Sequence, residues 1–228
     1  MHPIPTLTLE TELAAGGSDY VFGLDEVGRG ALAGPVMVGV VALRSCDLPG
    51  LKVPEGVADS KMLTPVRRTA IYLDLEDWAA AWAVGAASNR EIDQWGITHA
   101  LGIAALRALA DIETRLGMGA ESNTSAILDG PSDYITKAAD SFDAPDLAIL
   151  PAITTKVRGD ASCATVASAA VIAKVTRDRF MVDLAGQRDD LAPYQWERNK
   201  GYGSPAHMAA IRRYGPSDLH RVSWHLTG

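Results

Sequence analysis

Two apolar segments separated by a glycine-rich turn constrain the fold of this chain most strongly. Tyr20 to Leu24 is short, apolar and β-prone, and Gly34 to Leu43 is a Val-rich run of the same kind. Gly28 and Gly30 lie between them, where a turn needs residues that tolerate unusual backbone angles. The pattern predicts a β-hairpin near the N-terminus.

Helix and strand patterns alternate after this hairpin. Apolar residues recur at spacings of four, three and four from Ile71 to Trp82, which predicts an amphipathic helix with Thr64 as its N-cap. A small-residue strand is expected from Ala83 to Ala87. A second helix is expected from Thr98 to about Leu116, and Gly117 is expected to end it as a C-cap.

The second half of the chain continues the alternation. Ser125 to Leu128 is an apolar run stopped by a turn, and Leu147 to Pro151, with Ile153, suggests another short strand. A helix is expected from Ser162 to about Ala185. Glycines and prolines after Leu191 indicate short helices and turns. These patterns predict an α/β or mixed-sheet domain over residues 19–177, a flexible extension over residues 1–18 and a helical appendage over residues 178–228.

Composition excludes several classes of protein. The longest apolar stretches, Ala31 to Leu43 and Ala164 to Ala173, are shorter than the ~20 residues that a membrane-spanning helix requires. The N-terminus shows no secretory signal pattern, so we expect a cytoplasmic protein with no membrane partner. Cys46 and Cys163 are too few for a disulfide framework or a thiolate zinc site, and both are expected to be buried.

The charge distribution is uneven along the chain. The formal net charge of −7 alone argues against a nucleic-acid partner, because phosphates are neutralised by Lys and Arg. Residues 150–228, however, contain 11 Lys and Arg against 7 Asp and Glu, whereas residues 1–149 contain 10 against 21. The last third of the chain is therefore the better candidate for a surface that faces phosphates.

Four acids stand at the ends of core elements. Asp25 and Glu26 follow an apolar strand, Asp129 ends the next predicted strand, and Asp160 precedes a predicted helix. Gathered carboxylates bind hard cations such as Mg²⁺ or Mn²⁺, and a pair of such ions can catalyse phosphodiester hydrolysis. Taken alone, Asp160 could be a helix N-cap and Asp129 an ordinary turn residue. Asp25 and Glu26 are harder to explain without a cation, because two adjacent acids in an apolar segment repel each other.

The motifs around these acids resemble those of bacterial ribonuclease HII, a type 2 ribonuclease H family. The opening motif runs from Gly23 to Gly30 and continues to Val36. The later motifs occur in the family's order across some 180 residues: Asp59-Ser60-Lys61, Glu91-Ile92-Asp93, Leu128-Asp129-Gly130, Arg158-Gly159-Asp160, Thr176-Arg177-Asp178 and Gly201-Tyr202-Gly203-Ser204 with His207. Two departures are Ala31, where the family often has proline, and Arg158, where it usually has lysine. The 31 positions from Asp129 to Asp160 also imply a longer connection.

The resemblance implies a ribonuclease H-like mixed five-stranded sheet flanked by helices, with a small helical C-terminal part that binds substrate. It implies that Asp25, Glu26, Asp129 and Asp160 are catalytic and hold two Mg²⁺ or Mn²⁺ ions. The implied reaction hydrolyses the RNA strand of RNA/DNA hybrids and nicks duplex DNA on the 5′ side of embedded ribonucleotides, leaving 3′-hydroxyl and 5′-phosphate ends. The implied enzyme is a monomer that removes ribonucleotides from DNA; no recruiting replication or repair protein can be named from the sequence.

The resemblance also implies substrate-binding residues. Gly28, Arg29 and Gly30, together with Tyr202, would recognise the junction between a ribonucleotide and the following deoxyribonucleotide. Glycines suit this task because their backbone groups can approach the 2′-hydroxyl closely. The implied phosphate contacts are Lys61, Arg158 and Ser204.

Three alternatives compete with this interpretation. A histidine acid–base pair is disfavoured, because His99, His207, His220 and His225 are scattered along the chain. A proofreading-type exonuclease also uses a few carboxylates and two metals, but it would lack the Gly-Arg-Gly motif. A catalytically silent hybrid-binding protein would not need all four acids.

Overall fold

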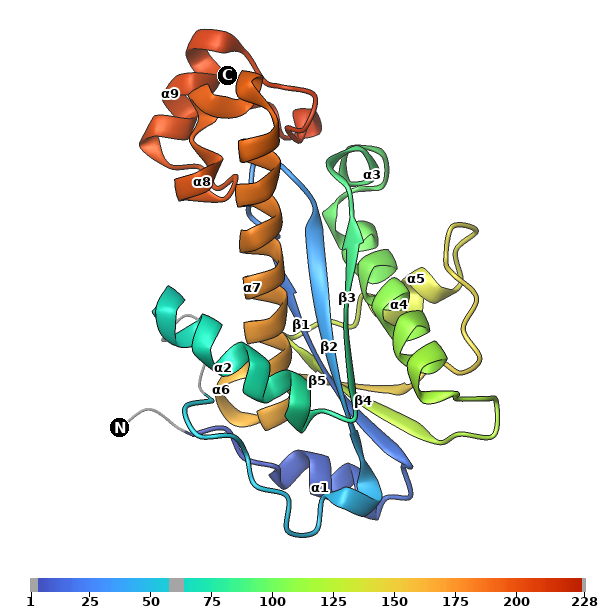
Figure 1. Cartoon of the computed structure of the whole chain (residues 1–228). Helices are drawn as coiled ribbons and strands as arrows, with labels where there is room; N and C mark the ends of the chain where they lie inside the picture. Colours follow the sequence, from blue (N-terminus) through green and yellow to red (C-terminus); the bar gives the residue numbers. More distant parts are fainter. Residues whose placement is uncertain (1–3, 58–63, 227–228) are drawn as a thin grey trace.

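The computed structural model describes residues 4–57 and 64–226. Within these residues the strands form one five-stranded sheet in the order β3-β2-β1-β4-β5 (Figure 1). Strands β1 and β2 pair antiparallel, as do β2 and β3, whereas β4 runs parallel to both β1 and β5. The expected mixed five-stranded sheet is confirmed. Its strands are β1 (Tyr20–Val27), β2 (Val36–Arg44), β3 (Ala81–Ala87), β4 (Thr124–Asp129) and β5 (Ala152–Lys156).

Helices cover both faces of the sheet (Figure 1). Helices α3 (Asn89–Trp95), α4 (Ile97–Leu116) and α5 (Ile135–Ala139) lie on one side, and α2 (Pro65–Trp78) and α7 (Ala164–Gln187) on the other. Apolar side chains of β1 and β2 alternate between the two cores, so that Val40 packs toward α4 and Val41 toward α2 and α7. At Gly23 a Cβ would lie 2.3 Å from the backbone of Thr165, so glycine lets α7 approach β1 closely.

Several predicted boundaries differ from the structure. Helix α2 ends at Trp78 and not at Trp82, which lies in β3; Trp82 shares the α2 core through an edge contact with Tyr72. The short strand predicted from Leu147 to Pro151 with Ile153 exists, but its bounds differ: β5 begins at Ala152 and contains Ile153 and none of residues 147–151. Helix α3 was not predicted; a Ser88–Glu91 capping box begins it. Gly117 ends α4 in the left-handed conformation, as expected.

The N-terminal segment differs from the flexible extension that we expected. Helix α1 (Thr8–Ala15) packs against residues of β1, β4 and α7, and its Glu10 is fully buried. One carboxylate oxygen of Glu10 accepts hydrogen bonds from the backbone N–H and the hydroxyl of Thr165, in the first turn of α7. The chain just before α1 pairs with Cys163 through Thr6. Residues 6–15 are therefore part of the packed domain.

The C-terminal part has a small core of its own, which includes Met181, Leu191, Trp196 and Ile211. Helix α7 is continuous across the predicted boundary at residue 178, and its last turns belong to this second core (Figure 1). The division at that position stays a prediction. The remaining helical elements are η1 (Ser45–Asp47), α6 (Gly159–Ser162), η2 (Asp189–Tyr194), α8 (Trp196–Asn199), α9 (Pro205–Tyr214) and η3 (Val222–Trp224).

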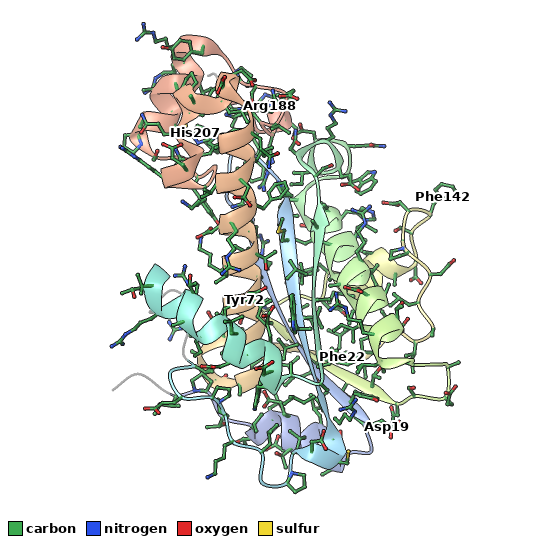
Figure 2. All side chains as sticks on the ribbon, viewed as in Figure 1. Asp19, Phe22, Tyr72, Phe142, Arg188 and His207 are labelled. Carbon is green, nitrogen blue, oxygen red and sulfur yellow. The ribbon has the colours of Figure 1, made fainter. Side chains whose placement is uncertain are left out.

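The longer connection after α5 is held by side chains of α4. His99 pairs with Asp143 at 2.9 Å, and the Glu113 carboxylate accepts hydrogen bonds from the backbone N–H groups of Ala148 and Ile149. Near the start of this loop, Phe142 points into solvent (Figure 2). Cys46 is exposed, contrary to expectation, whereas Cys163 is buried. In residues 4–57 and 64–226 no helix is long and apolar enough to span a membrane.

Candidate active site

Three of the predicted acids meet near the C-terminal ends of the parallel strands β1 and β4. Asp25 lies in β1 and Asp129 ends the parallel neighbour β4, with Leu24 opposite Leu128 in the register, so the two acids follow side by side. Asp160 comes from α6, which follows β5. One carboxylate oxygen from each of Asp25, Asp129 and Asp160 lies within 4.8 Å of the others. Hard divalent cations prefer oxygen donors in such an arrangement.

The electrostatics of the cluster fit a cation. Only 8% of the Asp25 surface is exposed. Burial raises the pKa of Asp25 well above its usual range, and the charges of Asp129, Glu26 and Asp160 raise it further. A divalent ion among the three carboxylates would replace this mutual repulsion by attraction. The donor set therefore fits Mg²⁺ or Mn²⁺.

Glu26 lies beside this group but has different partners. Arg29 donates a hydrogen bond to its Oε1 at 3.3 Å, and the buried Tyr134 hydroxyl approaches its Oε2 at 3.5 Å. Burial raises the pKa of Glu26, and the charge of Arg29 opposes the rise. Glu26 lines a cavity of about 390 Å³ together with Asp25 and Asp129, so it can reach the same ligand space.

The structure does not support the purely local roles considered above, a turn residue for Asp129 and a helix N-cap for Asp160. Asp129 Oδ1 accepts a hydrogen bond at 2.7 Å from the backbone N–H of Gly159, 30 residues away, so it is more than a local turn residue. Asp160 lies inside α6, whose N-cap is Arg158, and the N-cap of α7 is Cys163. The bond from Gly159 holds α6, and with it Asp160, against the end of β4.

The Gly28-Arg29-Gly30 turn forms another wall of the same cavity. Gly28 has φ +80°, and a Cβ there would lie 2.1 Å from the Arg177 guanidinium, so only glycine fits. The Gly28 N–H donates a hydrogen bond to the Tyr202 hydroxyl at 3.1 Å. Residues 174 positions apart in the sequence thus meet beside the acids, as the expected junction site requires.

Tyr202 is half-buried between two cations of α7. Lys174 Nζ lies 5.4 Å and the Arg177 guanidinium carbon 5.3 Å from the centre of its ring. Ala31 pairs with Tyr202 in an isolated antiparallel bridge, which fixes its backbone. The ring and its hydroxyl both line the cavity wall shared with Gly28.

The predicted phosphate contacts have different outcomes. Lys61 lies outside the described residues. Arg158 is exposed next to Gly159, in the left-handed conformation. Ser204 is the N-cap of α9, and its hydroxyl oxygen accepts a hydrogen bond from the His207 N–H. These positions leave their phosphate roles as predictions.

Sequence reasoning missed two cations of the cavity, Arg68 on α2 and Lys174 on α7. Lys174 donates to Asp178 at 2.7 Å and stands one helical turn after Ala170, which also lines the cavity. The sequence does not single out Ala170 as a lining residue, so this spacing becomes informative only once the fold is known. Arg68 carries no local signal either, because its helix reaches the cavity only through the tertiary fold.

The histidines are less scattered than the sequence suggested. His207 and His220 lie 3.0 Å apart between their Nε2 atoms, and the Trp196 indole donates to His207 Nε2 at 3.0 Å. Burial lowers the pKa of both imidazoles, to about 4 for His220. His207 lies in the C-terminal part (Figure 2), His220 packs there against Tyr194 and Trp196, and neither histidine lines the cavity with the acids. They form a structural pair that does not supply a catalytic acid and base.

Comparisons with known proteins agree with this geometry. The Ribonuclease HII family model matches residues 22–227. A Ribonuclease HII of Streptomyces griseus is 43% identical over 96% of this chain and 84% of its own length, and one of Geobacillus thermodenitrificans is 39% identical over 94% and 72%. The crystal structure of ribonuclease H2 from Pyrococcus horikoshii OT3 superposes with a TM-score of 0.67 at 25% identity, covering 91% of this chain and 94% of that one.

These similarities extend over nearly the whole chain, and the residues matched by the family model span the segment that carries Asp25, Asp129 and Asp160. The fold, the acid cluster and the matched family are all consistent with a nuclease of the hydrolase class. This chain belongs to the ribonuclease HII family.

Proposed function

We propose that this enzyme hydrolyses RNA/DNA hybrids and nicks duplex DNA on the 5′ side of embedded ribonucleotides, with two divalent ions as cofactors. The observation that carries the proposal is a cluster of three carboxylates within 4.8 Å of one another, two of which, Asp25 and Asp129, line one cavity together with the Gly28–Gly30 turn and Tyr202. The ions can be Mg²⁺ or Mn²⁺.

Asp25, Asp129 and Asp160 would hold the metals, and Glu26 would complete the ligand set. When bound, such ions would supply the chemistry that activates a water molecule and neutralises charge on the leaving oxygen. Gly159 fixes the orientation of the Asp129 carboxylate through its N–H. Arg29 and Tyr134 hold Glu26 at the rim of the cavity. The products carry 3′-hydroxyl and 5′-phosphate ends.

Selectivity for RNA depends on the 2′-hydroxyl. The backbone of Gly28, Arg29 and Gly30 recognises this group at the cavity wall, and the Tyr202 ring packs on the deoxyribose that follows. Lys61, Arg158 and Ser204 contact phosphates, and Lys174 adds positive charge close to Tyr202. The enzyme acts as a monomer in the cytoplasm and removes ribonucleotides from DNA.

The test uses a long RNA/DNA hybrid with end-labelled RNA, incubated in Mn²⁺ or in EDTA. We expect internal cuts in the RNA strand with Mn²⁺ only and an intact DNA strand. Asp129→Asn should lower the rate by orders of magnitude while the protein stays folded. Asp74→Asn, which changes an exposed acid on α2, is the matched control and should cleave normally.

Two outcomes would overturn the proposal. Stepwise digestion from one end would indicate a proofreading-type exonuclease. Binding of the hybrid without cleavage in Mn²⁺ would indicate a catalytically silent hybrid-binding protein.

A further inference from the structure

The Gly28–Gly30 turn is held by chain segments far away in the sequence. Leu32 donates its N–H to the Gly201 carbonyl at 2.8 Å, and Arg221 donates its backbone N–H to the Leu32 carbonyl at 2.9 Å. Ala33 forms an isolated bridge with His220. Residues 28–35 therefore depend for their conformation on contacts with the C-terminal part.

Two buried arginines add a second set of contacts to the same segment. Arg221 donates to the carbonyls of Gly28 at 2.7 Å, Arg29 at 2.9 Å and Gly34 at 3.1 and 3.2 Å. Arg177, on α7, donates to the carbonyls of Ala33, Pro35 and Lys200 at 2.9–3.1 Å. Both side chains are fully buried.

These guanidinium groups are unusual because their hydrogen bonds go to backbone carbonyls. Among the described residues neither forms an ion pair with a carboxylate. Burial lowers the pKa of Arg221 to about 9, so the group remains charged at neutral pH. Burying a charge is costly unless every donor is used, and a planar guanidinium can fix several carbonyls at once.

The geometry of the peptide bond converts these contacts into a property of the site. In a trans peptide the C=O of one residue and the N–H of the next point in opposite directions. Because Arg221 holds the carbonyls of Gly28 and Arg29, the N–H groups of Arg29 and Gly30 point away from it. Within the described residues neither N–H forms a hydrogen bond, and the space above Gly30 is open.

We propose that Arg221, supported by Arg177, is a positioning residue that presents the N–H groups of Arg29 and Gly30 to the 2′-hydroxyl and so sets the preference for ribose over deoxyribose. This inference rests on the proposed function, in which the Gly28–Gly30 turn recognises that hydroxyl. Arg221 itself does not contact the substrate in this account.

The test measures discrimination in binding, so that it does not depend on catalysis. Arg221→Lys is made in an Asp129→Asn background, and affinities are measured for a duplex with one ribonucleotide and for the all-DNA duplex of the same sequence. A lysine keeps the charge and has three donors, but it lacks the planar fork with which Arg221 spans the carbonyls of Gly28, Arg29 and Gly34. We expect affinity for the ribonucleotide duplex to fall about ten- to hundredfold, with little change for the DNA duplex.

Controls separate positioning from folding. Arg115→Lys, on an exposed site of α4, should leave both affinities unchanged. Thermal melting checks each variant, and if Arg221→Lys does not fold, Arg177→Lys is measured in its place, with a smaller loss in the same direction expected. Equal losses on both duplexes, or an unchanged ratio in a folded variant, would overturn the inference. No preference for ribose in the Asp129→Asn parent would instead contradict the proposed function.

Discussion

Asp25→Asn removes one negative charge from the centre of the acid cluster while nearly preserving side-chain shape. The Asp25 Oδ1 atom accepts a hydrogen bond from the Glu26 N–H at 2.8 Å, and an asparagine oxygen can accept the same bond. The substitution therefore changes electrostatics with little change in packing. Its effect on stability should have opposite signs with and without metal.

The magnitude follows from the cluster geometry. Two unit charges 4.8 Å apart repel by about 3 kcal/mol at an effective dielectric constant of about 20. Asp25 faces two such neighbours, and their charges add to the effect of burial in raising its pKa. We expect the metal-free variant to gain about 1–3 kcal/mol, which is roughly 2–12 °C in melting temperature for a chain of this size.

The assay is thermal melting in EDTA and in a Mn²⁺ series. Wild type should gain about 2.7 kcal/mol when Mn²⁺ reaches a hundred times its Kd, whereas the variant should gain little. Asp74→Asn serves as the control, because that acid is exposed on α2. A variant that is less stable than wild type in EDTA, or that gains as much from Mn²⁺, would refute the reasoning.

Three further predictions test other parts of the account. Burial lowers the pKa of His220 from 6.5 to about 4, so the unfolded chain takes up a proton at higher pH than the folded protein does. The free energy of unfolding should therefore fall as the pH drops from 6.5 to 4, by at most about 3 kcal/mol. His220→Gln should weaken this pH dependence in melting experiments. Affinity for a hybrid duplex should fall with rising salt despite the net charge of −7, and a flat salt series would mean that the C-terminal cations do not face phosphates. Tyr202→Phe loses only the bond from Gly28 and should keep much of the activity, whereas Tyr202→Ala should lose more activity on a single ribonucleotide than on a long hybrid; equal losses on both would exclude the junction role.

The sequence predicted the sheet and the acid cluster because both depend on local patterns. Apolar strands that end in acids predict where carboxylates gather once the strands lie parallel, as β1 and β4 do. The predicted helix end failed at Trp82 because this residue packs in the same core from the next strand. Strand β5 was misplaced because Ala152–Lys156 is partly exposed and mostly polar, with little apolar alternation.

The contacts that hold the site together had no such local signal. Arginines are normally expected at the surface, and only the tertiary fold shows that Arg177 and Arg221 are buried against residues 28–35. His207 and His220 are separated by 13 positions and meet across the C-terminal core. Glu10 is part of an N-terminal segment whose packing on α7 is visible only in the fold. Long-range hydrogen bonds of this kind depend on the topology of the fold, and the spacing of apolar residues along the sequence does not predict them.

The most direct test of the account is cleavage of a duplex that carries one ribonucleotide in an otherwise all-DNA strand. The cut position is mapped on a sequencing gel, and the upstream end is tested for extension by a DNA polymerase. We predict a single metal-dependent nick on the 5′ side of the ribonucleotide, with an extendable 3′-hydroxyl and a 5′-phosphate. Asp129→Asn should not make this nick. A nick on the 3′ side, a terminal 2′,3′-cyclic phosphate, or full activity in EDTA would contradict the assignment of the four acids as metal ligands beside a ribose-reading turn.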